Sequence, residues 1–84
     1  MMPRETAATI LERWDDCQVH TAVNPKTGRN FAARVYLMRG KGEPDLLYST
    51  TYCYRTEAKA EEVMTKILED LRERYPNPQR LRRG

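Results

Sequence analysis

Residues 24–36 read NPKTGRNFAARVY and combine a turn, a basic tip and the start of a β-strand. Asn24-Pro25 favours turn initiation, and Gly28 is free to take a positive φ. From Phe31 onward the side chains form two unlike alternating sets, with the period of two expected of a strand. We therefore predict a hairpin with a cationic tip. The tip residues that cannot usefully be buried are Lys26, Thr27, Arg29 and Asn30.

Helical periodicity indicates one helix before the strands in the sequence and one helix after them. Before them, apolar residues recur at i, i+3, i+4 and i+7 over residues 7–14. After them, Thr56 can N-cap a helix whose apolar stripe continues to Tyr75, where Pro76 ends it. Each predicted helix therefore has one apolar face that must be buried.

Alternating side chains predict strands over residues 17–23, 31–38 and 46–54. The order helix, strand, strand, strand, helix predicts an α+β fold, in which a three-stranded antiparallel sheet carries both helices on one face. We expect a single α+β domain over residues 1–75. A basic, flexible tail is expected over residues 76–84.

Length and charge limit the function classes. A chain of 84 residues buries only about 60–65% of its unfolded surface, which is enough for one small domain. No apolar run is long enough for a bilayer span or a secretory signal, so we expect no membrane partner and a cytoplasmic location. Three tail arginines equal the whole net charge of +3, so the remainder is neutral overall. The tail either improves solubility or adds a non-specific phosphate contact.

The reactive side chains point to no catalytic centre. Cys17 and Cys53 fall on the first and third predicted strands, roughly 10 Å apart across the second, which is too far for a disulfide. We expect two reduced, buried thiols. His20 is the single histidine and belongs to no close-spaced ligand pair, so no metal or other cofactor is expected. Neighbouring acids such as Asp15 and Asp16 diverge on a helix, and we expect no enzyme.

The element order and the hairpin sequence resemble those of the double-stranded-RNA-binding domain. In that family the loop between the first two strands reads Gly-Pro-x-His-x-Lys-x-Phe, and residues 24–31, NPKTGRNF, match it in spacing. The family's second helix opens with Lys-Lys-x-Ala-Lys, and residues 55–59, RTEAK, are similar in three of those features. Glu12 can hold the place of the first-helix residue that faces RNA. The resemblance covers residues 6–71.

The resemblance implies that this chain binds duplex RNA. A-form RNA is read largely by shape, with a loop in one minor groove and cations at a helix start against phosphates of the adjacent major groove. The loop histidine and glycine of the family are replaced by Thr27 and Asn24, and Glu57 and Glu61 near Lys59 would repel phosphate. An alternative interpretation is that the cations are ordinary solvated surface charges. The residues implied in RNA contact are Glu12, Lys26, Thr27, Arg29, Arg55 and Lys59.

A second function class follows from the sheet face turned away from the helices. The alternation along the third strand does not decide which of its two sets of side chains lies on that face. We favour the tyrosines, because Leu47 and Cys53, in the other set, are easier to bury. Such an aromatic and cationic patch suits a protein partner or a second copy, or stacks single-stranded bases. The alternative is that cross-strand pairs merely shield the sheet. This class is a protein-interaction module, such as a regulator or inhibitor of a host or mobile-element protein. Its predicted interface residues are Arg34, Tyr36, Met38, Tyr48, Tyr52 and Tyr54.

Overall fold

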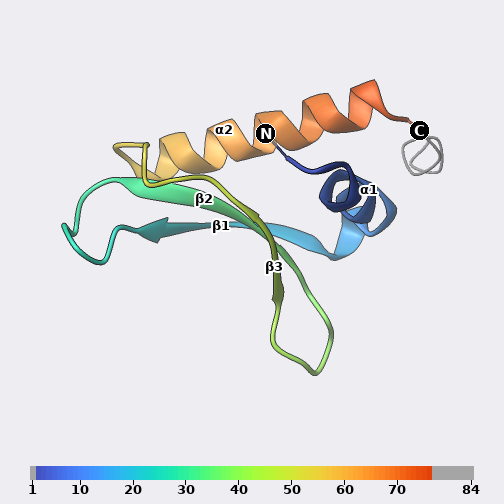
Figure 1. The fold of residues 1–84 in the computed structure, drawn as a ribbon, viewed down its shortest axis with the longest axis horizontal. Helices are drawn as coiled ribbons and strands as arrows, with labels where there is room; N and C mark the ends of the chain where they lie inside the picture. Colours follow the sequence, from blue (N-terminus) through green and yellow to red (C-terminus); the bar gives the residue numbers. More distant parts are fainter. Residues whose placement is uncertain (1, 77–84) are drawn as a thin grey trace.

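The computed structural model describes residues 2–76 and has the predicted element order (Figure 1). A three-stranded antiparallel sheet lies between two helices in the sequence, which confirms the predicted α+β fold. The predicted basic tail lies outside the described residues except for Pro76. The elements are α1 (Arg4–Glu12), a 3-10 turn (Trp14–Asp16), β1 (Cys17–Val23), β2 (Phe31–Leu37), β3 (Asp45–Ser49) and α2 (Glu57–Arg74).

The sheet is a meander with β2 in the centre. β1 pairs with β2 over its whole length, so that Val19 lies opposite Val35 and His20 lies opposite Arg34. Because successive side chains of a strand point to opposite faces, this register separates the apolar set from the polar set across the full hairpin.

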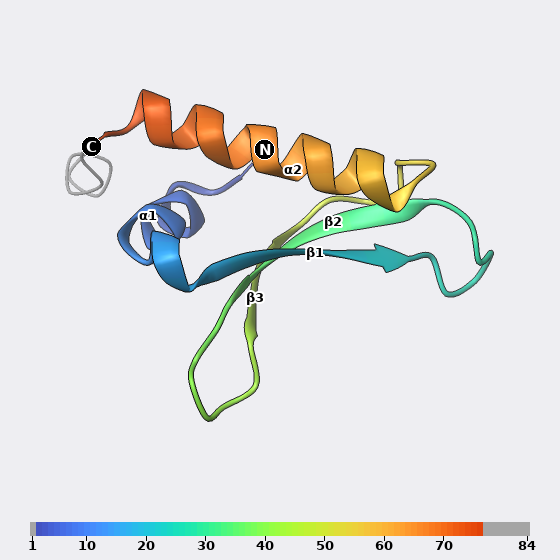
Figure 2. The ribbon, with the colours of Figure 1, turned by 180° about the vertical axis from the view of Figure 1, so that it is seen from behind.

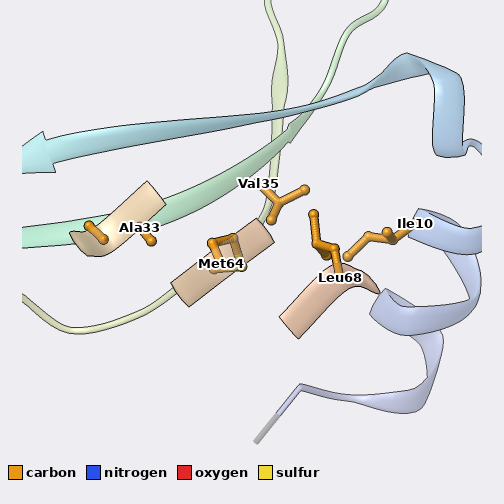
Figure 3. Packing of buried hydrophobic residues seen from close by; sticks show 6 residues of the cluster. Ile10, Ala33, Val35, Met64 and Leu68 are labelled. Carbon is orange, nitrogen blue, oxygen red and sulfur yellow. The ribbon is translucent and has the colours of Figure 1, made fainter. Parts of the chain in front are cut away.

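Both helices pack on the same face of the sheet, around one small core (Figure 3). Ile10 of α1 and Met64 of α2 are fully buried and meet Val35 of β2. Ala33 and Ala60 complete the contact, and their small side chains allow α2 to approach the strands closely. One face of the sheet is therefore covered by the two helices.

Capping and sequence explain where α2 begins. The Thr56 side-chain oxygen accepts a hydrogen bond from the backbone N–H of Lys59 at 3.1 Å, and Glu57 occupies the first turn. The capping hydrogen bond and the acidic side chain both stabilise the N-terminus of a helix, where the helix dipole is positive. The predicted N-cap is thus confirmed.

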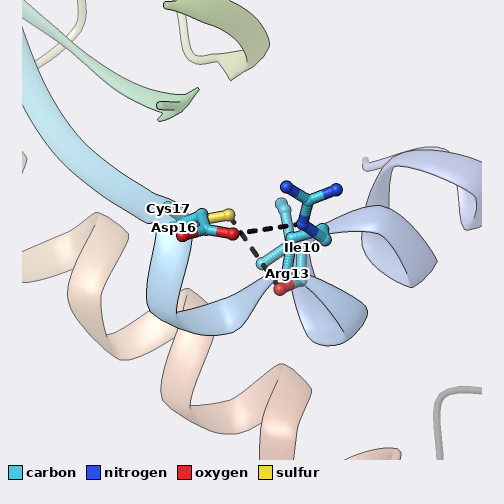
Figure 4. A network of polar contacts seen from close by, with 4 residues as sticks. All are labelled: Ile10, Arg13, Asp16 and Cys17. Atoms are coloured by element: carbon cyan, nitrogen blue, oxygen red, sulfur yellow. Dashed lines mark hydrogen bonds and ion pairs between the residues drawn. The ribbon is translucent and has the colours of Figure 1, made fainter. Parts of the chain in front are cut away.

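A compact polar junction joins α1 to β1 (Figure 4). The helix ends at Glu12, and Arg13 Nε then pairs with Asp16 Oδ2 at 3.1 Å across the 3-10 turn. The Cys17 thiol lies 4.0 Å from the Ile10 carbonyl oxygen, to which it donates. The chain therefore reverses between helix and strand within a few residues.

The third strand differs from the prediction. It ends at Ser49, and the segment beyond it is joined to β2 by separate hydrogen bonds, including those of the Phe31–Tyr54 bridge. A bulge opposite Val35 and Tyr36 places one extra residue, Leu47, in β3. A bulge of this kind lets two neighbouring side chains point to the same face, and Leu47 and Tyr48 both pack against the core.

Two side-chain predictions on and after β3 were consequently wrong. The tyrosines do not share the outer face, because Tyr48 and Tyr54 pack against the core cluster on the helix side. Cys53 was expected to be buried but is exposed, since the regular alternation stops after Ser49. Cys17 is half-buried, and neither thiol is in a disulfide.

Candidate functional site

The β1–β2 loop is held by its own polar groups. Asn24 Oδ1 accepts from the backbone N–H of Lys26 at 3.0 Å, and the Asn24 carbonyl oxygen accepts from Gly28 at 2.8 Å. Thr27 Oγ1 donates to the Arg29 carbonyl oxygen and accepts from the Arg29 N–H, at 3.0 and 3.1 Å. The side chains of Lys26 and Arg29 are left exposed at the tip.

Two further exposed cations, Arg55 and Lys59, lie at the start of α2. Lys59 Nζ is 3.7 Å from Glu62 Oε2, and both side chains are more than half exposed. A long ion pair between exposed groups holds its partners weakly, so Lys59 remains available to another anion. Glu57 in the same turn lowers the positive potential of this surface.

The fold brings these two cationic groups together. In both views the β1–β2 loop and the start of α2 lie at the same end of the molecule, while α1 lies at the other end (Figures 1 and 2). We call Lys26, Arg29, Arg55 and Lys59 the basic end. Glu12 belongs to α1 and is not part of it. Thr27 shapes the loop through its hydrogen bonds, at a position where the sequence suggested only a contact with RNA.

The second predicted site centres on Arg34, on the sheet face without helices. Its Nη2 donates to Tyr52 Oη at 3.1 Å and its Nη1 to Tyr36 Oη at 3.4 Å. The hydrogen bond with Tyr36 raises the pKa of the guanidinium, so Arg34 stays charged. Both tyrosine oxygens accept from Arg34, so each O–H group keeps its own hydrogen to donate. His20 meets the Tyr36 ring edge-on, with centroids 5.4 Å apart.

We call this surface the open face; no described helix covers it. Arg34, Tyr36 and Tyr52 come together there as predicted, whereas Tyr48 and Tyr54 do not. Met38 follows β2 and is half-buried. The structure adds one residue that the sequence did not indicate. Leu46 pairs with Tyr36 and is 51% exposed, and the β3 bulge that sets its register has no clear sequence signal.

Burial also affects two titratable groups outside these surfaces. Burial, followed by the charge of Asp16, raises the pKa of the Cys17 thiol, although Arg13 partly opposes the shift. Burial is likewise the main cause that raises the pKa of Tyr54, with a hydrogen bond to Cys53 adding to it. Both shifts favour the neutral form of the group.

Surface hollows border both helices. One of about 210 Å³ lies between β1 and α2, and one of about 320 Å³ lies between α1 and the second half of α2. The first is lined by Trp14, Cys17, Val19, Thr65, Leu68 and Glu69. Within residues 2–76, no three His, Cys, Asp or Glu side chains gather in a way that could hold a metal ion, and no helix is long and apolar enough to cross a membrane.

Comparison with known proteins adds no family. No family model matches the chain, and no curated protein and no solved structure matches it significantly. The resemblance to the double-stranded-RNA-binding domain therefore stays a prediction, carried by residues 24–31 and 55–59.

Proposed function

We propose that this protein is a small non-enzymatic binding module that takes duplex RNA at the basic end. The observation that carries the proposal is that two cationic groups far apart in the sequence lie at the same end of the molecule. Residues 24–30 supply a protruding loop, and residues 55–59 supply a helix start at the same end of the molecule. This is the pair of parts that shape recognition of an A-form helix requires.

In the proposed complex, the loop enters the minor groove with Lys26 and Arg29 against the sugar-phosphate edges. The start of α2 then faces phosphates across the neighbouring major groove, where Arg55, Lys59 and the free N–H groups of the helix attract anions. Glu57 and Glu62 offset part of this attraction. We therefore expect modest affinity with a strong dependence on salt.

An electrophoretic titration with duplex RNA, duplex DNA and single-stranded RNA at two salt concentrations tests the proposal. We expect duplex RNA to bind most tightly. Lys26→Ala with Arg29→Ala should weaken binding, and should reduce the slope of log affinity against log salt by about two, one for each cation removed from the phosphates. Lys59→Ala should have the same effect on a smaller scale.

A matched control removes equal charge elsewhere. Lys41→Ala with Lys66→Ala changes the β2–β3 loop and a later turn of α2 and leaves the basic end intact. If this control weakens RNA binding as much as the change at the loop, the affinity reflects net charge only. Equal binding of all three nucleic acids, or none, contradicts the proposal.

A protein-interaction role on the open face is the second candidate, and a specific observation favours it. Arg34 donates hydrogen bonds to Tyr36 and Tyr52, so both side chains are already positioned before a partner binds. Leu46 adds exposed apolar surface on the same face. Preordered tyrosine and arginine side chains are typical of binding hot spots. Under this candidate, the protein has no salt-dependent affinity for duplex RNA, and Tyr36→Ala weakens self-association or partner capture.

A further inference from the structure

The free edge of β1 is poorly protected against strand pairing. β1 is an outer strand that pairs only with β2, and its seven residues, CQVHTAV, include no Asp, Glu, Lys, Arg or Pro. Sheet edges are usually blunted by such residues or by short strands. Val23, the last residue of β1, is 43% exposed.

The hydrogen bonds to β2 show which backbone groups of β1 remain unpaired at this edge. The N–H of Met38 donates to the Asp16 carbonyl oxygen, and the N–H of Asn24 donates to the Asn30 carbonyl oxygen. Backbone groups alternate in direction along a strand, so even-numbered residues of β1 point to β2. The odd-numbered residues present their N–H and C=O groups to the free edge. These are Cys17, Val19, Thr21 and Val23, except that the N–H of Cys17 already donates to the Trp14 carbonyl oxygen.

We propose that a second copy of this chain pairs with this edge, β1 against β1, around a two-fold axis at His20. In this register Val19 lies opposite the second copy's Thr21, and Cys17 lies opposite the second copy's Val23. The outward N–H and C=O groups of Val19 and Thr21 then pair fully, and the Cys17 carbonyl oxygen accepts from the second copy's Val23, while the Cys17 N–H keeps its bond to Trp14. His20 meets its own copy in a non-hydrogen-bonded pair. The two sheets thereby join into a continuous six-stranded sheet.

Charge complementarity favours a second copy as the occupant. β1 begins after the exposed Asp15 and Asp16 and ends at the loop that carries Lys26. Antiparallel pairing places the start of one strand beside the end of the other. Asp15, and Asp16 with its ion-pair partner Arg13, therefore lie beside the other copy's basic loop, and these three residues carry a net charge of −1. Within the strands there is no charged side chain to repel the partner.

The side chains beside the edge also fit a second copy. The hollow of about 210 Å³ between β1 and α2 is lined by Trp14, Cys17 and Val19 on its strand side. The second copy's Val23, opposite Cys17, would cover the rim of this hollow and become buried. An edge-to-edge contact would thereby gain apolar burial in addition to backbone hydrogen bonds.

Disulfide trapping tests the register in the full chain. In a Cys17→Ser, Cys53→Ser background, His20→Cys places two thiols across the axis, where Cα atoms of such a pair are about 4.5 Å apart. Gln18→Cys is the matched control on the same strand and face, because its own copy would be about 13 Å away. With oxidised glutathione as the oxidant, we expect a rapid covalent dimer from His20→Cys and little from Gln18→Cys.

Sedimentation of the unmodified protein, without nucleic acid, provides the second measurement. We expect a concentration-dependent dimer, and we expect Thr21→Pro to abolish it while circular dichroism stays unchanged, because that N–H faces the edge and not β2. A monomer up to millimolar concentration overturns the proposal, as does faster trapping of Gln18→Cys than of His20→Cys. Neither result bears on RNA binding, which the gel titration measures separately.

Discussion

At the scale of single residues, the β1–β2 loop depends on two left-handed backbone positions. Gly28 has φ of 65° and Asn30 has φ of 62°. Glycine adopts this region freely and asparagine tolerates it, whereas residues with other side chains are strained there. The loop sequence therefore constrains the shape of the tip as well as its charge.

Gly28→Ala should destabilise the fold by about 1 kcal/mol, because a Cβ at Gly28 meets no neighbouring atom and only the left-handed conformation is unfavourable. Urea unfolding measures the change. Gly42→Ala is the control, since Gly42 has no positive φ and its Cβ would make an ordinary contact with Arg39 at 3.9 Å. Equal losses of stability at the two positions would contradict the conformational explanation.

The two cysteines should differ in reactivity. Burial raises the pKa of Cys17, so its thiol stays protonated at pH 8 and reacts slowly, and its alkylation should accelerate only at more alkaline pH. Cys53 is exposed and should react first with iodoacetamide at pH 8. Mass spectrometry with Cys17→Ser and Cys53→Ser as references assigns each rate. Faster modification of Cys17 would show that the thiol is not held in the way described.

At the scale of elements, α2 is specified locally and β3 is not. Thr56, Glu57 and the apolar stripe of α2 carry its start and its buried face in the sequence, and the structure has both. At the β3 bulge, Leu47 and Tyr48 are both half-buried and pack against the core, to which α1 and α2 contribute. No local sequence pattern encodes this packing of two neighbouring side chains on one face. This is why the orientations of Tyr48 and Cys53 could not be predicted.

Thr56→Ala should cost about 1 kcal/mol of stability, because the Lys59 N–H would have no acceptor at the positive end of α2. Thermal unfolding followed by circular dichroism measures it. Thr56→Ser keeps the hydroxyl and should be nearly neutral. Thr65→Ala, an exposed change in the same helix, should also have little effect. A destabilisation by Thr65→Ala as large as that by Thr56→Ala would argue against a capping role.

At the scale of the whole molecule, stability rests on few side chains. The main buried cluster holds one side chain from α1, two from β2 and three from α2, and half of its members are small or medium-sized. A domain of this size has little stability in reserve. In the described residues, the same economy leaves one sheet face and the outer edges of β1 and β3 for contacts with other molecules.

Met64→Ala should reduce the free energy of unfolding by about 3 kcal/mol, because the side chain is fully buried where both helices meet the sheet. Ile67→Ala, at a half-buried position one turn away, should cost clearly less. Chemical denaturation of both variants gives the comparison. Similar costs at both positions would mean that the core is centred elsewhere.

The candidate site could be predicted from the sequence only in part. The sequence shows the four cations of the basic end. Its turn and capping signals also assign two of them to the hairpin loop and two to the start of α2. That Arg34 orders Tyr36 and Tyr52 depends on the path of the chain after β3, which brings Tyr52 back over β2. The free odd-numbered groups of β1 likewise become apparent only once the β1–β2 register is known.

Binding of duplex RNA at the basic end is the central claim, and mapping of amide chemical shifts during titration with a short RNA duplex tests it most directly. We predict shifts concentrated in residues 24–30 and 55–59, which fade as salt is added. Absence of shifts, or shifts confined to the open face around Arg34 and Tyr36, would contradict it.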